Sequence, residues 1–282
     1  MSLILPISAA ILQAASFTLD KFTLLIKKVT YKTYIGISFP LAFLFTLIIF
    51  LIFKPPLTLE LFAGKYLWLL ILSIILLIGT NIIFYRALKA DLLSEIQTIA
   101  LLTNIPLIIF AVFFFSNERN VLIVSLALIA VISIVWSHWE KGHFQIAKKT
   151  FPFLVWALIV APFSGIISKT LLEIWNPISF ELIRNGAVAF IFIFIFFKSI
   201  KTVPKKALPL LLFTNLLTTI AWILYFFSYQ ILGIIHTVLI FSLQPILVYF
   251  ASIFFLKEKL HRKKFIAFII ILIAISIGQI FK

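Results

Sequence analysis

Cysteine is absent from this sequence, methionine occurs once, and Asp and Glu together number nine in 282 residues. Without cysteine the chain cannot form disulfides, thiolate metal sites or a cysteine nucleophile. Charged residues make up 12% of the chain, about half the share of a typical soluble domain, whereas 63% of the residues are hydrophobic. A soluble core of this length does not need so much apolar surface, so the composition predicts an integral membrane protein.

Phosphate-binding and metal-binding motifs are also missing. The sequence has no GxxxxGK[ST] or GxGxxG loop, which argues against ATP hydrolysis, and no HExxH or paired-histidine motif. We therefore expect no metal, no cofactor and no enzymatic activity, and gradients must supply any energy. The formal charge of +15 does not indicate nucleic acid, because the basic residues stand in short clusters between apolar runs.

Apolar runs of about 20 residues, bounded by charged residues or by Pro, Gly and Asn, follow one another along the chain. Because every backbone amide must be hydrogen-bonded inside hydrocarbon, such runs form helices. The pattern predicts an all-α, polytopic membrane protein with ten transmembrane helices. Their expected ranges are 3–26, 34–53, 66–85, 92–115, 121–136, 151–172, 178–197, 208–232, 235–256 and 265–281.

Lysine and arginine are distributed unevenly over the connections between these helices. Seventeen lie in the odd-numbered connections, and four lie in the even-numbered connections or at the C-terminus. The positive-inside rule places the odd connections in the cytoplasm and both termini outside. We expect a multi-pass protein of the plasma (inner) membrane, surrounded by the lipid bilayer.

The two halves of the sequence are similar to each other. In the first half, Ile105-Pro106 is followed by Asn117-Glu118-Arg119. In the second half, Gln244-Pro245 is followed in the same way by Lys257-Glu258-Lys259. Ser16 and Lys21 also correspond to Ser164 and Lys169. Five helices per repeat is an odd number, so the halves have opposite orientations, which is the inverted-repeat plan of secondary transporters. The expected repeats are residues 1–140 and 150–282.

The second half carries a family resemblance. Its segment SLQPILVYFASIFFLKEKL, residues 242–260, resembles without gaps the SLEPV…LLLGERL signature of the drug/metabolite transporter superfamily, in the ten-helix form with two EamA-type repeats. The spacing of Pro177, Glu181 and Arg184 is similar to that family's pattern between its sixth and seventh helices. Gln244 stands where the family commonly has Glu, so the acidic residue that some relatives use there is absent.

The resemblance covers the whole chain and implies a ten-helix basket with a central cavity and alternating access. Relatives export amino acids, metabolites or drugs, or carry nucleotide sugars and choline. The resemblance therefore implies transport of a small organic molecule and does not select among these solutes.

Polar and aromatic side chains gather at similar depths on the predicted helices. Gln13, Ser16 and Asp20 recur at spacings of three and four, on one face of the first helix that lipid would not tolerate, so this face is expected to line a cavity. On the eighth helix Trp222 and Tyr225 form an aromatic wall that suits an amphipathic or cationic solute, and helix packing explains such aromatics equally well. The predicted solute-binding residues are Gln13, Ser16, Asn81, Tyr85, Thr98, Trp222, Tyr225 and Gln244.

Charged residues are predicted near helix ends, where ion pairs or snorkelling side chains are the simplest interpretation. Asp20 and Glu95 are the candidates if transport is coupled to protons. Pro106, Pro162 and Pro245 each remove a helical hydrogen bond, and are expected either to open the helix locally beside a solute or to form a static packing kink.

The sequence thus predicts a secondary transporter, an exporter or permease, for a small neutral, zwitterionic or cationic metabolite. A lipid-flippase-like carrier with the same fold is an alternative. An intramembrane enzyme is a weaker alternative, because the nucleophile or metal ligands that it needs are missing from the sequence.

Overall fold

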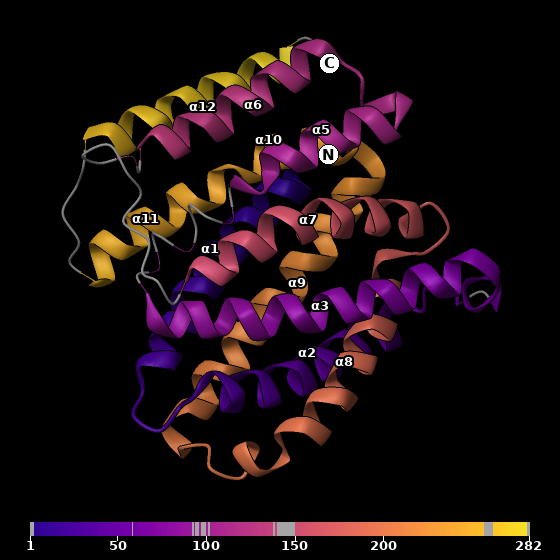
Figure 1. Ribbon diagram of the computed structural model, residues 1–282, viewed down its shortest axis with the longest axis vertical. Coiled ribbons are helices and arrows are strands. Elements are labelled where there is room, and N and C mark those ends of the chain that lie inside the picture. Colours follow the sequence, from indigo (N-terminus) through magenta and orange to yellow (C-terminus); the bar gives the residue numbers. More distant parts are fainter. Residues whose placement is uncertain are drawn as a thin grey trace.

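The computed structural model describes residues 3–57, 59–91, 93, 96, 100, 102–137, 139, 150–256 and 262–280. Every regular element within these residues is a helix (Figure 1). Two of the predicted site residues, Glu95 and Thr98, lie outside the described residues.

The helices follow the apolar runs of the sequence closely. The first half contains α1 (Ile4–Leu25), α2 (Tyr31–Phe53), the 3-10 helix η1 (Leu59–Phe62), α3 (Gly64–Ala90), α5 (Asn104–Phe114), the 3-10 helix η2 (Ser116–Glu118) and α6 (Val121–Ser137). The second half contains α7 (Phe151–Leu172), α8 (Pro177–Ile200), the 3-10 helix η3 (Lys205–Ala207), α9 (Leu208–Leu232), α10 (Ile234–Phe241), α11 (Leu243–Leu256) and α12 (Arg262–Ile280).

The span predicted over residues 235–256 consists of two helices, α10 and α11, that meet at Ser242. The backbone N–H of Ser242 is shared between the carbonyls of Val238 (3.0 Å) and Leu239 (3.3 Å), and its hydroxyl donates to Val238 O (2.8 Å). Pro245 has no N–H to continue the helical ladder three residues later. The span is therefore interrupted at Ser242, three residues before Pro245, one of the prolines at which the sequence predicted a local opening or a kink.

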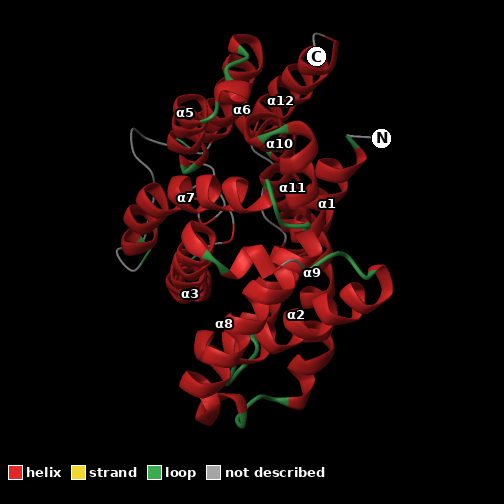
Figure 2. Ribbon diagram, turned by 90° about the vertical axis from the view of Figure 1, so that its right-hand side faces the viewer, coloured by secondary structure: helices red, strands yellow, loops and turns green. Residues whose placement is uncertain are grey.

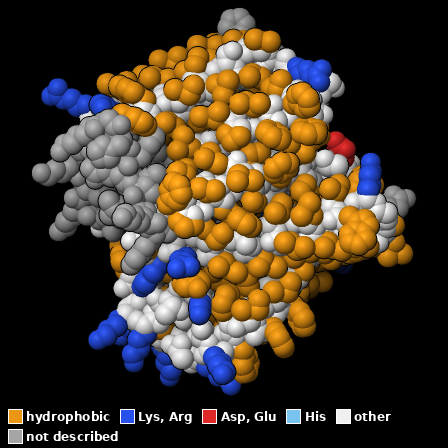
Figure 3. Space-filling view, in the orientation of Figure 1, with side chains coloured by type: hydrophobic (Ala, Val, Ile, Leu, Met, Phe, Trp, Pro, Cys, Tyr) orange, Lys and Arg blue, Asp and Glu red, His pale blue; other side chains and the backbone are white. Residues whose placement is uncertain are grey.

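Six segments of the described residues are long and apolar enough to cross a membrane. They are α2, α3, α7, α8, residues 205–232 with α9, and residues 234–255 with α10 and α11. Large apolar side chains cover the outside of these helices, as in Phe194, which is 81% exposed. Figure 3 shows one such face, an almost continuous apolar surface with Lys and Arg confined to its margins. An exterior of this kind suits lipid and not water.

Helices from the two halves interleave. α2 packs against α8, α1 against α9, α3 against α7, and α6 against α12. Figure 2, which looks along many of the helix axes, shows these helices as one bundle. The buried apolar residues form two clusters, and each cluster draws on helices of both halves. The two halves therefore share their cores, and neither forms a separate domain.

Candidate functional site

A cavity of about 340 Å³ lies inside the bundle. Side chains of α1, α2, α3, α5, α7, α8, α9, α10 and α11 line it, so both halves of the chain contribute to its wall. This volume is at the small end of the range for sites that bind small molecules. The wall has three distinct parts, which are an aromatic surface, a charged pair and a set of neutral polar groups.

The aromatic surface lies on α9. Trp222, Tyr225, Phe226 and Tyr229 recur at spacings of three and four, which places them on one face of the helix. The ring centroids of Trp222 and Tyr225 are 5.3 Å apart and those of Tyr225 and Tyr229 are 4.7 Å apart. The hydroxyls of the two tyrosines are hydrogen-bonded at 2.8 Å, and Phe241 of α10 extends the surface at 4.7 Å from Tyr225. This part of the wall offers ring faces and one polar edge.

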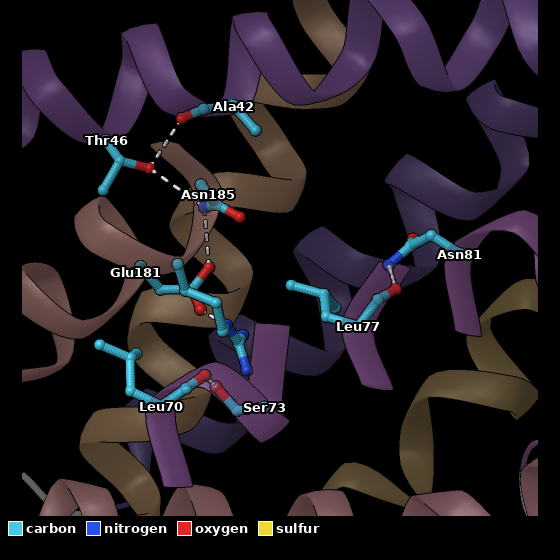
Figure 4. Close-up of polar contacts among 9 residues, drawn as sticks. Ala42, Thr46, Leu70, Ser73, Leu77, Asn81, Glu181 and Asn185 are labelled. Atoms are coloured by element: carbon cyan, nitrogen blue, oxygen red, sulfur yellow. Dashed lines mark hydrogen bonds and ion pairs between the residues drawn. The ribbon is translucent and has the colours of Figure 1, made fainter. Parts of the chain in front are cut away.

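The charged pair is Glu181 and Arg184, in the first two turns of α8. Arg184 Nη2 donates to Glu181 Oε1, and Asn185 Nδ2 donates to Glu181 Oε2 at 3.0 Å (Figure 4). The guanidinium also lies over the rings of Phe180 (4.6 Å) and Phe226 (4.9 Å), which stabilise a cation. The sequence predicted helix-end ion pairs or snorkelling side chains, and this is such an ion pair. Its burial in the cavity wall was not predicted.

The neutral polar groups and the aromatic surface together include six of the predicted solute-binding residues. Gln13, Asn81, Tyr85, Trp222, Tyr225 and Gln244 all line the cavity. Most hydrogen-bonding groups in the wall are satisfied by the protein itself, as in Asn81, whose Nδ2 donates to Leu77 O at 2.8 Å (Figure 4). Ser73 likewise donates to Leu70 O at 2.8 Å.

Ser16 and Asp20 lie behind the wall, contrary to the prediction that they face the cavity with Gln13. Ser16 is hydrogen-bonded to Thr214 (3.0 Å) and Thr218 of α9, which pack directly on this face of α1. Asp20 is 1% exposed and accepts hydrogen bonds from Tyr34, from Tyr85 (3.3 Å) and from Thr214 (2.5 Å). The packing of α9 on α1 therefore closes the face that spacing alone left open.

The second half of the chain matches a known family. Residues 150–277 match the model of the EamA-like transporter family. The chain contains an EamA-like transporter domain. The resemblance to the drug/metabolite transporter superfamily, predicted from residues 242–260, is confirmed, and the chain is a multi-pass membrane protein with the general function of a transporter.

The fold of the complete chain also recurs. A crystal structure described only as that of a protein matches 99% of this chain and 96% of its own, with a TM-score of 0.70 and 15% identity. Similarity at this level of identity concerns the fold alone. No curated protein matches the sequence.

Two of the three predicted helix-breaking prolines have equivalent positions in the two halves, and the third differs. Pro245 is the third residue of α11, and Pro106 is the third residue of α5, so each lies in the first turn of a helix, where its missing N–H is tolerated. Pro162 lies inside α7, which continues through it without interruption. Of the two alternatives predicted for Pro162, local opening or static packing, the continuous helix favours static packing, because neighbouring helices in a membrane protein stabilise such a helix.

Sequence reasoning named Glu181 and Arg184 but did not include them among the residues of the site, although both line the cavity. Glu181, Arg184 and Asn185 have spacings of three and four and so share one face of α8. This spacing is the feature of the sequence from which the polar face of α8 could have been predicted. The pair stands close to a helix end in the sequence, and only the packing of α9 and α2 over this end places it inside the bundle.

Proposed function

We propose that the protein is a secondary transporter that moves a small organic solute across the plasma membrane by alternating access. The cavity carries the proposal, because its wall combines an aromatic surface with hydrogen-bonding groups inside a bundle whose exterior suits lipid. The cavity is also small. A volume of about 340 Å³ fits a metabolite better than a whole phospholipid, which favours solute transport over lipid flipping.

The proposed architecture is a pair of inverted repeats, residues 1–140 and 150–282, that form ten transmembrane helices. Two buried lysines support it. Lys21 of α1 donates to the carbonyls of Leu88 (2.8 Å) and Asp91 (2.5 Å) at the end of α3, and Lys169 of α7 donates to the Tyr229 carbonyl (2.7 Å) near the end of α9. In both places a cation lies at the negative end of a helix dipole.

In each half a second hydrogen bond runs in the opposite direction, from a side chain of the third helix to a carbonyl of the first. Lys89 of α3 donates to Leu24 O, three residues after Lys21, and Gln230 of α9 donates to Leu172 O (2.6 Å), three residues after Lys169, and to Trp175 O (2.7 Å). We call these two reciprocal contacts the terminal latches, α1–α3 and α7–α9. Equivalent latches at equivalent positions are what a duplicated five-helix unit would produce.

Asp20 is the proposed site of proton coupling. It is a buried carboxyl held by three hydroxyl groups, and one of these belongs to Tyr85, which also lines the cavity. A change in the protonation of Asp20 would therefore alter a hydrogen bond made by the cavity wall. Uptake by Asp20→Asn should no longer respond to a pH gradient, and a normal response of that variant would exclude Asp20 from coupling.

Transport can be tested in proteoliposomes. Compounds that raise the melting temperature of the purified protein would be identified first, because a ligand of the folded state stabilises it, and their uptake would then be compared with that of empty liposomes. Trp222→Ala should lower uptake at least about tenfold, which corresponds to the loss of 1.4 kcal/mol of solute contact.

The matched control is Trp68→Ala, which removes a tryptophan that is 71% exposed on the outside of α3. This variant should fold and transport normally. If no stabilising compound enters protein-containing vesicles faster than empty ones, the transporter proposal is wrong. If Trp222→Ala transports normally, the aromatic surface is not part of the solute site.

A further inference from the structure

Three buried polar atoms, on residues that line the cavity, have no hydrogen-bond partner within the part of the chain that the structure describes. They are Nε2 of Gln13, Nε of Arg184 and Oγ1 of Thr219, on α1, α8 and α9. The three residues are 2%, 7% and 1% exposed, so bulk water does not reach them freely. Buried polar groups in proteins are almost always paired, and exceptions need an explanation. Because all three residues line one cavity, a molecule bound there is the simplest explanation.

The unpaired atoms specify the chemistry of that molecule. The amide nitrogen of Gln13 and Nε of Arg184 can only donate hydrogen bonds, and the hydroxyl of Thr219 can donate one. A bound group must therefore offer acceptor atoms. Guanidinium and amide groups bind carboxylate and carbonyl oxygens well, and a guanidinium can bind a carboxylate through two N–H groups.

The cavity wall offers fewer binding groups to a cation than to a hydrogen-bond acceptor. Glu181, the acidic residue of the described wall, already accepts hydrogen bonds from Arg184 and Asn185. The ring faces of Phe180 and Phe226, which would attract a cation, already hold the Arg184 guanidinium. Asp20 is not part of the wall. The wall thus lacks a free carboxylate among its described residues and has free donors.

We propose that the cavity binds its solute through an oxygen acceptor, a carboxylate or carbonyl group, that receives hydrogen bonds from Gln13, Arg184 and Thr219, with the apolar part of the solute against the aromatic surface of α9. This inference rests on the proposed transport function and narrows its solute to acceptor-bearing molecules. It removes simple organic cations from the range that the sequence allowed.

The test uses sets of three compounds that differ only in the head group. Each set has one aryl body, such as phenyl or naphthyl, joined by a short linker to a carboxylate, a primary amide or an amine. Binding to the purified full-length protein is measured by thermal shift and by titration. The carboxylate or amide member of at least one set should bind tenfold or more tightly than the amine member.

Two variants remove donors without changing the charge of the wall. Gln13→Leu and Thr219→Val should each weaken binding of the carboxylate and amide members about tenfold, the effect of losing one hydrogen bond worth about 1.4 kcal/mol, and should leave amine binding unchanged. Ser73→Ala is the matched control, because the Ser73 hydroxyl also lies in the wall but is already paired with Leu70 O. That variant should keep the wild-type preference.

The outcomes separate clearly. Amines that bind as tightly as carboxylates and amides would overturn the inference, and so would the absence of binding by every carboxylate and amide at concentrations on the order of 10 mM. If a variant does not fold, the head-group preference of the wild-type protein still decides. Binding at equilibrium does not require translocation, so acceptor-selective binding without vesicle uptake would contradict the transport proposal and leave this inference standing.

Discussion

Glu118 in η2 caps a helix that begins far away in the sequence. Its two carboxylate oxygens accept hydrogen bonds from the backbone N–H groups of Ile234 (2.6 Å) and Ile235 (3.1 Å) at the start of α10. A negative group at this end of a helix is stabilised by the helix dipole. Gly233 makes the approach possible, because a Cβ at this position would lie 2.5 Å from Glu118 Oε1.

Gly233→Ala should destabilise the protein. The backbone of Gly233 has φ +84° and ψ 174°, a conformation open almost only to glycine, which costs another residue roughly 1–3 kcal/mol. Displacing the Glu118 carboxylate from its buried donors adds about 1–3 kcal/mol. Chemical or thermal unfolding in detergent should show both losses as a lower midpoint.

Gly64→Ala is the control for this substitution. Gly64 also has a positive φ, +53°, but a Cβ there would meet nothing within 4 Å. It should cost only the backbone energy, about 1–2 kcal/mol. Equal effects of the two substitutions would show that the Glu118 cap contributes nothing to stability.

At this scale the sequence predicted the right kinds of residue and only some of their surroundings. Helical spacing found Gln13, and the mid-helix aromatic pattern found Trp222 and Tyr225, because both signals are local. Ser16 and Asp20 share their helix face with Gln13, but Thr214 of α9 covers them. That contact joins residues nearly 200 positions apart, and no local pattern reports it.

The terminal latches operate at the scale of whole helices. Lys21 and Lys169 are 9% and 8% exposed, which is rare for lysine, and each is held by backbone carbonyls at a helix end. Each latch joins the first and third helices of its own half, whereas the most extensive packing of these four helices joins α1 to α9 and α3 to α7. The latches therefore add polar contacts between helices whose main packing is with the other half.

A double-mutant cycle can test whether each latch acts as a unit. Lys169→Met removes a charged donor to Tyr229 O, and Gln230→Leu removes the side-chain donor to Leu172 O and Trp175 O. Each substitution should cost about 1–3 kcal/mol. Their effects on unfolding free energy should not add, because residues in one hydrogen-bond network are coupled.

The control pair is Lys21→Met with Gln230→Leu, which affects two different latches. These effects should add within about 0.5 kcal/mol. Equal coupling in both pairs would mean that the contacts act through global stability and not as separate latches.

Helix positions were the most predictable feature of the elements. α7 and α9 have the predicted bounds, because Pro and charged residues mark their ends. The division between α10 and α11 could not be placed in the same way. A proline in an apolar run permits a break, as near Pro245, or a continuous helix, as at Pro162, and the choice depends on what packs around it.

The whole molecule has one basic end. Thr150 donates to Asp91 Oδ2 (2.9 Å), which joins the fifth connection to the third, and Lys263 donates to Trp139 O (3.1 Å), which joins the ninth to the fifth. Ile200, before the seventh connection, packs against Gly36 near the start of α2. Lys89, beside the third connection, donates to Leu24 O, beside the first. The described flanks of the odd connections thus lie on one side, and Figure 3 shows Lys and Arg gathered over the α1–α2 and α8–α9 connections at one edge of the apolar face.

We predict that this basic side faces the cytoplasm, with both termini outside. The natural absence of cysteine provides a clean background for labelling. Lys27→Cys, in the first connection, should be protected from a membrane-impermeant maleimide in intact cells, and Leu57→Cys, in the second, should react. Both positions are exposed, so the reverse pattern would mean that the protein has the opposite orientation.

The pairing of Glu181 with Arg184 has an electrical consequence. The two charges cancel, so they add no gating charge when the cavity changes its side of access. Moving one elementary charge across 100 mV corresponds to about 2.3 kcal/mol. Voltage then acts on a charged cargo and on any coupled ion, and not on this pair. In a cell with a negative interior it would drive an anionic cargo outward without further fuel, and a neutral cargo would cross without generating a current.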